Sequence, residues 1–195
     1  MAGWPWNPHF DLPPAFLHEE VPRSCVVLTL QRYQIPPDLF IGYMGMERGR
    51  VGMANRNSNG SYDYGPSQVN SIWLQEISQF GVTAAQLQWN PCVNIWVGGW
   101  IMRRCLNKFP GQFWTAVGCY HIGEHALETA DLSLRARRMK RGQNYAREVY
   151  SVMTKYRQPF WQWLNNRSAY AQMPDVGGPT QDQAASPSKS EVASR

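Results

Sequence analysis

The chain has 195 residues, of which 43% are hydrophobic, so it is long enough for one sizeable core and too short for two full-sized domains. An aromatic content of 13% excludes a largely disordered chain, because such chains contain few large apolar side chains. The formal net charge of +5 favours an anionic partner and does not choose among nucleic acid, lipid and an acidic polymer.

Proline dominates the N-terminal segment, residues 1–23, which is therefore predicted to be an extended arm. Each proline removes a backbone donor and fixes φ, which opposes regular structure. The prolines of this segment are Pro5, Pro8, Pro13, Pro14 and Pro22. A secretory leader needs a basic start and an apolar run of about 7–15 residues. No signal peptide is visible in this segment.

The first predicted helix covers about residues 37–48. Pro36 and Pro37 followed by Asp38 favour a helix start, because proline suits the first turn and an acid suits the positive end of the helix dipole. Gly49 favours its end.

A turn or a small β-hairpin is predicted over residues 55–64, where the Asn59-Gly60 pair is a strong hairpin signal. Helical spacing of apolar residues resumes over 66–79 and ends at Gly81.

Later helix starts are also visible. Thr83 with Gln86 forms a capping box, and Asn90-Pro91 begins a longer helix. Two further helices are predicted at about 112–120 and 142–157. The sum is a mainly α (α+β) fold with one small β excursion, in a single domain over residues 24–165. The last segment, 166–195, is rich in Gly, Pro, Ser and Gln and is predicted to be a flexible tail.

One carboxylate of the 37–48 helix projects from its apolar face. The stripe at helical spacing consists of Phe40, Tyr43, Met44 and Glu47. Burial and the negative end of the helix dipole both raise the pKa of such a group. A carboxyl that stays protonated near neutrality suits a general acid, as in lysozyme. Arg48 and Arg50 oppose the effect if they fold over Glu47, and an ordinary helix-end salt bridge is the alternative.

The four cysteines have no C-x-x-C spacing, which argues against a zinc ribbon or a thioredoxin-like pair. They are Cys25, Cys92, Cys105 and Cys119. Two antiparallel helices joined at the break over 108–111 would bring Cys105 and Cys119 together, which leaves Cys25 and Cys92 for a second bridge. Four reduced, buried thiols in a cytosolic protein are the alternative.

Three segments resemble a known superfamily. Residues 55–65, N-R-N-S-N-G-S-Y-D-Y-G, with the Q-V-N at 68–70 that follows, resemble the hairpin and next helix of the lysozyme superfamily. The N-P-C-V-N-I at 90–95 with Gly98, and the W-T-A-V-G-C-Y-H at 114–121, are similar to segments of lytic transglycosylases. The pattern over about 24–157 resembles the small specialised transglycosylases of type IV secretion, conjugation and pilus systems.

The resemblance implies roles for individual residues. Glu47 matches the sole catalytic acid/base of that family. The implied substrate-binding residues around it are Gln68, Asn70, Tyr120, Asp63, Ser67 and His121. Cysteines at equivalent places in the family favour a Cys25–Cys92 bridge. The sequence departs from the family pattern at Glu47-Arg48 (usually Glu-Ser), at Gly65-Pro66-Ser67-Gln68 (usually Gly-Leu-Met-Gln) and at Tyr120-His121 (usually Tyr-Asn).

The implied activity is non-hydrolytic cleavage of peptidoglycan. Glu47 protonates the glycosidic oxygen between N-acetylmuramic acid and N-acetylglucosamine, and the muramoyl C6 hydroxyl closes a 1,6-anhydro ring. The implied partners are glycan strands and proteins of a secretion, conjugation or pilus apparatus, for which the enzyme opens the wall locally in the periplasm. No cofactor or metal is expected. The longest apolar runs, 26–28 and 95–102, are shorter than the roughly 20 residues of a membrane-spanning helix, so no transmembrane segment is expected.

Four other interpretations remain open from the residues. A lysozyme-type hydrolase would use Asp63 beside Glu47. The H-x-x-E-H at 121–125 matches an inverted zinc-protease motif, although Gly123 weakens the helix that it needs. The basic run 135–141 suits a solvated face, an anionic peptidoglycan, lipid or protein partner, or nucleic acid, for which no recognised motif is present. Finally, Arg48 beside the acid leaves room for a non-catalytic glycan- or nucleic-acid-binding accessory protein.

Overall fold

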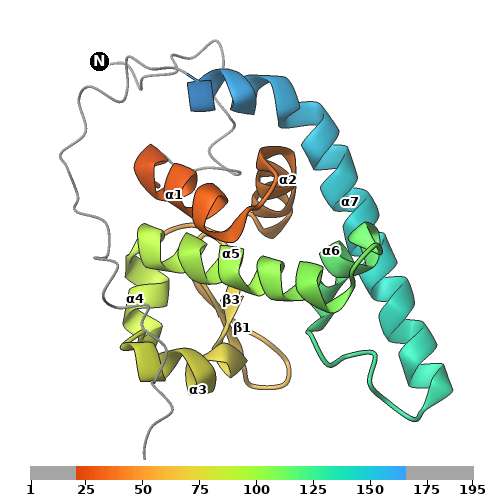
Figure 1. Ribbon diagram of the computed structural model, residues 1–195. Helices are drawn as coiled ribbons and strands as arrows, with labels where there is room; N and C mark the ends of the chain where they lie inside the picture. The colour runs from red at the N-terminus through yellow and green to blue at the C-terminus, as the bar shows by residue number, and fades with distance from the viewer. Residues whose placement is uncertain (1–20, 166–195) are drawn as a thin grey trace, which may run out of the picture.

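The computed structural model describes residues 21–165 (Figure 1). The predicted tail, 166–195, and all but the last residues of the predicted arm lie outside this range. The described part of that arm differs from the prediction, because Val21 is fully buried and the first helix, α1 (Arg23–Tyr33), already begins at Arg23. The predicted division into arm, domain and tail therefore stays a prediction apart from this boundary.

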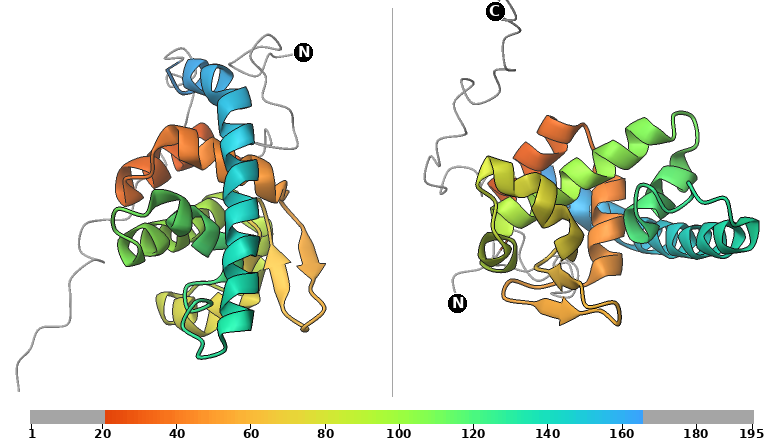
Figure 2. Two further views of the ribbon diagram at one scale, coloured as in Figure 1. Left: turned by 90° about the vertical axis from the view of Figure 1, so that its right-hand side faces the viewer. Right: turned by 90° about the horizontal axis from the view of Figure 1, so that it is seen from below.

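The architecture is mainly helical with a small sheet, as the sequence predicts. A helical body contains α1, α2 (Pro37–Glu47), α5 (Pro91–Lys108) and α6 (Phe113–Ile122), and the long α7 (Leu132–Asn165) runs along one side of it (Figures 1 and 2). A smaller region lies below α5 in Figure 1. It contains the strands β1 (Ala54–Arg56), β2 (Tyr62–Tyr64) and β3 (Val69–Asn70) and the helices α3 (Leu74–Ile77) and α4 (Ala84–Trp89).

Helix α2 is the centre of the body, because seven consecutive residues, 39–45, are buried on all sides. Its closest neighbour is α7, where a Cβ at Gly42 would lie 2.9 Å from Val149 Cγ1. Phe40 stacks on Phe160 of α7, with ring centroids 6.0 Å apart. A helix that is buried all round places the residue at its end, Glu47, at the edge of the core.

The hairpin predicted over 55–64 is present as β1 and β2, which pair antiparallel with Asn55 opposite Asp63. A third strand, β3, pairs with β2 and places Asn70 opposite Asp63. The helix predicted over 66–79 is wrong at its start. The backbone turns sharply at Gly65 and Gln68, both with positive φ, and the chain returns to helical geometry only in the short segments 71–80 that end at Gly81.

The predicted helix starts at Thr83 and Asn90 are confirmed. Thr83 and Gln86 form the reciprocal capping box of α4. The Asn90 side chain accepts from the backbone N–H groups of Cys92 and Val93 at 3.1 and 3.2 Å, and Pro91 occupies the first turn of α5. These local caps satisfy the N–H groups that a helix start leaves without partners.

The last helix is much longer than its predicted range of 142–157. Helix α7 has 34 residues, contains Pro159 and includes the whole basic run 135–141. From Gly142 onward it is amphipathic, with Tyr145, Val149 and Phe160 among its buried residues. None of the residues 132–141 is buried, which is why helical periodicity alone did not reveal this part of the helix.

Two disulfides connect the helices. Cys25–Cys92 joins α1 to α5, and Cys105–Cys119 joins α5 to α6, with Cα atoms 5.2 and 5.7 Å apart. Both pairings that the sequence suggested are confirmed, and the alternative of four reduced thiols is wrong. Disulfides form in oxidising compartments outside the cytosol. None of the helices in residues 21–165 has the length and apolarity that crossing a bilayer requires.

Candidate active site

A groove of about 450 Å³ lies between the sheet and the helices α6 and α7, at the C-terminal end of α2. Six of the polar side chains that line it come from five elements, α2, β2, β3, α6 and α7. These side chains are Glu47, Asp63, Asn70, Tyr120, His121 and Arg141. Gln68 lines it as well. The fold thus brings together Glu47 and five of the six predicted substrate-binding residues.

Glu47 is the last residue of α2, and its partly buried carboxylate lines this groove. Burial raises the pKa of Glu47 to about 7; a hydrogen bond from Tyr145 opposes the rise, and the charge of Asp63 adds to it. Arg48 caps the helix in the left-handed region and is exposed. Within residues 21–165 Glu47 takes part in no ion pair, so the helix-end salt bridge considered as the alternative does not form.

Tyr145 is the partner of Glu47 that sequence reasoning missed. Its hydroxyl donates to Glu47 Oε1 at 2.7 Å from α7, 98 residues further along the chain. The His121 ring stacks on the Tyr145 ring with centroids 4.8 Å apart and planes 5° from parallel. In the sequence, Tyr145 is indistinguishable from the other apolar positions of α7, and nothing local connects it to Glu47.

Asp63 is held by the amides of two asparagines. Asn57 Nδ2 donates to one carboxylate oxygen at 2.9 Å and Asn70 Nδ2 donates to the other at 2.7 Å. Both amides also donate to Ser61 Oγ, at 3.1 and 3.0 Å. One Asp63 oxygen therefore has a partner in the hairpin loop and the other has a partner on β3, and the carboxylate acts on Glu47 through its charge.

Gln68 and Tyr120 line the groove and are hydrogen-bonded to the turn over residues 65–68. The Gln68 amide donates to Gly65 O at 2.8 Å and its carbonyl accepts from Asn55 at 2.6 Å, so the side chain ties the turn to β1. The Tyr120 hydroxyl donates to Ser67 O at 2.8 Å.

Ser67 is the one predicted contact that the structure does not bring to the groove. It is fully buried, and its hydroxyl lies 3.4 Å from Met44 Sδ. A Cβ at Gly98 would lie 2.7 Å from Ser67 Oγ, so α5 covers this side chain closely. The Ser67 side chain lies in the core and not in the groove.

Asn94 of α5 anchors the sheet to the helices. It is fully buried, donates to Tyr64 O at 2.7 Å and Leu87 O at 2.8 Å, and accepts from Ser67 N at 2.7 Å. A Cβ at Gly65 would lie 2.4 Å from Asn94 Nδ2, and Gly65 has φ +63, so only glycine fits there.

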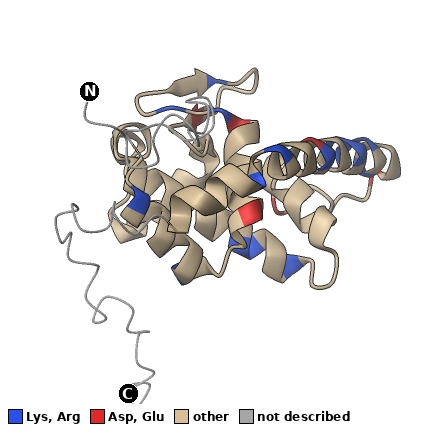
Figure 3. Cartoon of the chain, turned by 90° about the horizontal axis from the view of Figure 1, so that it is seen from above, with Lys and Arg blue, Asp and Glu red and all other residues tan. Residues whose placement is uncertain are grey.

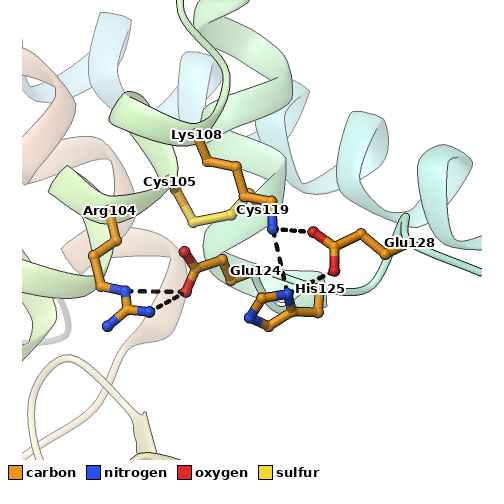
Figure 4. Close-up of a disulfide and its surroundings, with 7 residues drawn as sticks. All are labelled: Arg104, Cys105, Lys108, Cys119, Glu124, His125 and Glu128. Atoms are coloured by element: carbon orange, nitrogen blue, oxygen red, sulfur yellow. Dashed lines mark hydrogen bonds and ion pairs between the residues drawn. A yellow bond between two sulfur atoms is a disulfide. The ribbon is translucent and has the colours of Figure 1, made fainter.

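The H-x-x-E-H residues have separate partners. Glu124 pairs with Arg104 at 2.7 Å, whereas His125 pairs with Glu128 at 2.7 Å, beside the Cys105–Cys119 disulfide (Figure 4). His121 stacks on Tyr145 in the groove. No group of three metal-binding side chains occurs in the described residues.

The chain is similar in sequence to several known bacterial proteins. The chain is 32% identical to the X polypeptide of Escherichia coli over 132 residues, which is 67% of this chain and 73% of that protein. It is 35% identical to the invasion protein IagB of Salmonella typhimurium over 101 residues, 51% of this chain and 62% of that protein. Protein IpgF of Shigella flexneri is 30% identical over 94 residues, 48% of this chain and 61% of that protein. No family model matches the chain.

Proposed function

The chain belongs to the family of lytic transglycosylases associated with secretion and conjugation, and from this premise we propose that Glu47 is the acid and base that cleaves peptidoglycan. The bond cleaved is the β-1,4 linkage between N-acetylmuramic acid and N-acetylglucosamine. The observation that carries the proposal is a carboxyl at the end of a buried helix, in a groove, with a pKa of about 7 and a tyrosine hydroxyl on one oxygen.

The proposed reaction needs one carboxyl group. Protonated Glu47 gives its proton to the glycosidic oxygen, and the bond from that oxygen to muramoyl C1 breaks. The resulting carboxylate takes the proton from the muramoyl C6 hydroxyl, whose oxygen bonds to C1. Glu47 is thereby protonated again, and water is not consumed. The Tyr145 hydroxyl donates to Oε1, and in the proposed reaction the other oxygen, Oε2, faces the substrate.

Product analysis tests the reaction directly. Cell-wall sacculi digested in water enriched in heavy oxygen are expected to yield 1,6-anhydromuramoyl ends that contain no heavy oxygen. Mass spectrometry of the released muropeptides reads both the mass and the label. Reducing ends that carry the label would show a hydrolase and would overturn the proposed chemistry.

Asp63→Asn separates the transglycosylase from a two-carboxylate hydrolase. Because both Asp63 oxygens are bound by Asn57 and Asn70, we expect a structural and electrostatic role, and a loss of activity of no more than about tenfold. Removal of its charge also lowers the pKa of Glu47, since that charge raises it. Rates of muropeptide release measure the effect, and a loss of about a thousandfold would instead indicate a catalytic carboxylate.

Tyr145→Phe tests how Glu47 is held. The hydrogen bond lowers the pKa of Glu47, so its removal raises that pKa. Because the free enzyme needs protonated Glu47, kcat/KM of the parent falls as the pH rises through about 7. In the variant this fall moves to higher pH, and the maximal rate drops about tenfold because the carboxyl loses its orientation.

The control for this variant is Tyr150→Phe, which changes an exposed tyrosine on the same helix. It is expected to leave the pH profile unchanged. If the Tyr145→Phe variant is slower by the same factor at every pH, and the fall of kcat/KM stays at the parent's pH, the hydroxyl does not set the pKa of Glu47 and has only a structural role.

We also propose that the protein works in the periplasm on glycan strands, together with proteins of a secretion, conjugation or pilus apparatus. Two disulfides support an oxidising compartment. The kinship to the invasion protein IagB and to the X polypeptide supports the association. Arg48, the departure that raised a non-catalytic alternative, is exposed and leaves the Glu47 carboxyl without a cationic partner in the described residues.

A further inference from the structure

One cation lines the groove beside the two carboxylates. Arg141 comes from α7 and is exposed, and the groove that it lines also contains Glu47 and Asp63. Within residues 21–165, no hydrogen-bond or ion-pair partner of its guanidinium is found. A guanidinium binds carboxylate and phosphate groups well, because its donors form a planar fork.

The other cations of the basic run face elsewhere. Figure 3 shows Lys and Arg spaced along α7, and of this run only Arg141 lines the groove. Arg138 donates to Ala126 O at 2.9 Å and holds the loop before α7, while Arg137 donates to Ser133 Oγ at 2.6 Å on its own helix. Within the basic run, Arg138 thus contacts the loop before α7, Arg137 bonds within its own helix, and Arg141 lines the groove.

The adjoining cavity, about 560 Å³ in volume, also contains an arginine, but that charge is neutralised. Arg104 pairs with both Glu76 and Glu124 and lies over the Trp73 and Trp100 rings. The two cavities share Ile72, Trp73 and Gly123, so they form one continuous surface. Along this surface Arg141 is the cation with free donors among the described residues.

His121 lies on the same side of the groove and adds no competing charge near neutrality. Desolvation and the charge of Arg141 lower the pKa of His121, against the smaller opposing effects of Asp63 and Glu148. A neutral imidazole offers one donor and one acceptor. Asn57, Asn70 and Asp63 also line the groove, and their amide N–H groups and carboxylate are already hydrogen-bonded to one another.

We propose that Arg141 is a specificity-determining residue that binds the carboxylate borne by the O3 substituent of the muramoyl residue. This inference rests on the proposed function. The two sugars of peptidoglycan alternate and differ at that substituent, which ends in a lactyl carboxylate in bare strands and in stem-peptide carboxylates otherwise. An enzyme that cleaves only after the muramoyl C1 must distinguish the two sugars, and a cation in the groove does so by charge.

Binding to an inactive protein tests the inference. Glu47→Gln is titrated with peptide-free glycan strands and with the same strands after their lactyl carboxylates are converted to neutral methylamides. We expect about tenfold tighter binding of the charged strands, and loss of this preference in Glu47→Gln/Arg141→Gln. The matched control, Glu47→Gln/Arg137→Gln, removes the same charge from the same helix outside the groove and keeps the preference.

Kinetics give a second readout. In the active protein, Arg141→Gln is expected to raise KM for charged strands about tenfold and to change kcat less than about twofold, whereas Arg141→Lys restores part of the affinity. A further arm uses strands that retain their stem peptides. A charge preference found only with those strands assigns the carboxylate to the peptide, and one found with bare strands assigns it to the lactyl group.

The inference is overturned if Arg141→Gln keeps the full preference, or if Arg137→Gln loses it to the same extent, because the preference then reflects net charge. Failure of the proposed function looks different. In that case Glu47→Gln would still cleave the strands, whatever the binding comparison shows.

Discussion

Glu47→Gln is expected to lower the rate of glycan cleavage by about a thousandfold or more, since the same carboxyl acts as acid and base in the proposed reaction. Glutamine keeps the shape of the side chain and still accepts from the Tyr145 hydroxyl, so the groove is preserved. The rate of muropeptide release at pH 6 measures the loss. Glu148→Gln, an exposed change on α7, is the control that keeps full activity.

The same substitution is expected to stabilise the protein at alkaline pH. The pKa of Glu47 is about 7 in the folded protein against an ordinary 4.5, so the folded state binds more protons between these values. Stability of the parent therefore falls as the pH rises from about 4.5 to about 7, and the whole penalty is present above that range. Allowing for partial exposure, the gain for Glu47→Gln is about 2 kcal/mol at pH 8 and close to zero at pH 4.

Denaturant unfolding of both proteins at pH 4, 6 and 8 checks this dependence. If Glu47→Gln keeps its activity and shows the expected stability gain, Glu47 is desolvated in the folded protein but another residue is the catalytic acid. A variant with no activity and no stability gain would mean that Glu47 is not desolvated in the folded protein.

Asn94→Ala is expected to destabilise the protein by about 4 kcal/mol, because one fully buried side chain serves three backbone groups. The carbonyl groups of Tyr64 and Leu87 and the N–H of Ser67 lose their partner together. These groups lie on β2, on α4 and in the turn before β3, so the sheet loses its attachment to α5.

Urea unfolding of Asn94→Ala measures the effect, and its groove is expected to lose activity at temperatures where the parent is still active. Asn144→Ala, an exposed change on α7, is expected to alter stability by less than about 0.5 kcal/mol. A loss below about 1 kcal/mol for Asn94→Ala would show that water replaces its hydrogen bonds and that the sheet is anchored by other contacts.

Features with a local cause were predictable from the sequence. Proline at the start of α2, the capping box at Thr83 and the Asn90 cap depend on residues within one turn of each other. The position of Glu47 on the apolar stripe of α2 is equally local. It predicted that burial raises the pKa of Glu47, which is the direction found in the structure. The family motifs then placed Gln68, Asn70, Asp63, Tyr120 and His121 around one groove.

Features that depend on pairing and packing between elements were not predictable in this way. Helical spacing over 66–79 was a true pattern, but the pairing of β3 with β2 replaced its first part with a strand. Ser67 has a motif position at the groove and a side chain in the core, since the turn at Gly65 and the cover from α5 decide where it points.

The amino-acid sequence by itself determined the starts of α2, α4 and α5, the hairpin and the place of the proposed acid on its helix, because each depends on neighbours along the chain. It did not reveal α1 or the first part of α7. Only the tertiary structure decided what surrounds that acid. Tyr145 reaches Glu47 and Arg141 reaches the same groove because α7 packs along α2 and α6, nearly one hundred residues later in the chain. Such contacts follow from the shape of the assembled core, which no local pattern of residues records.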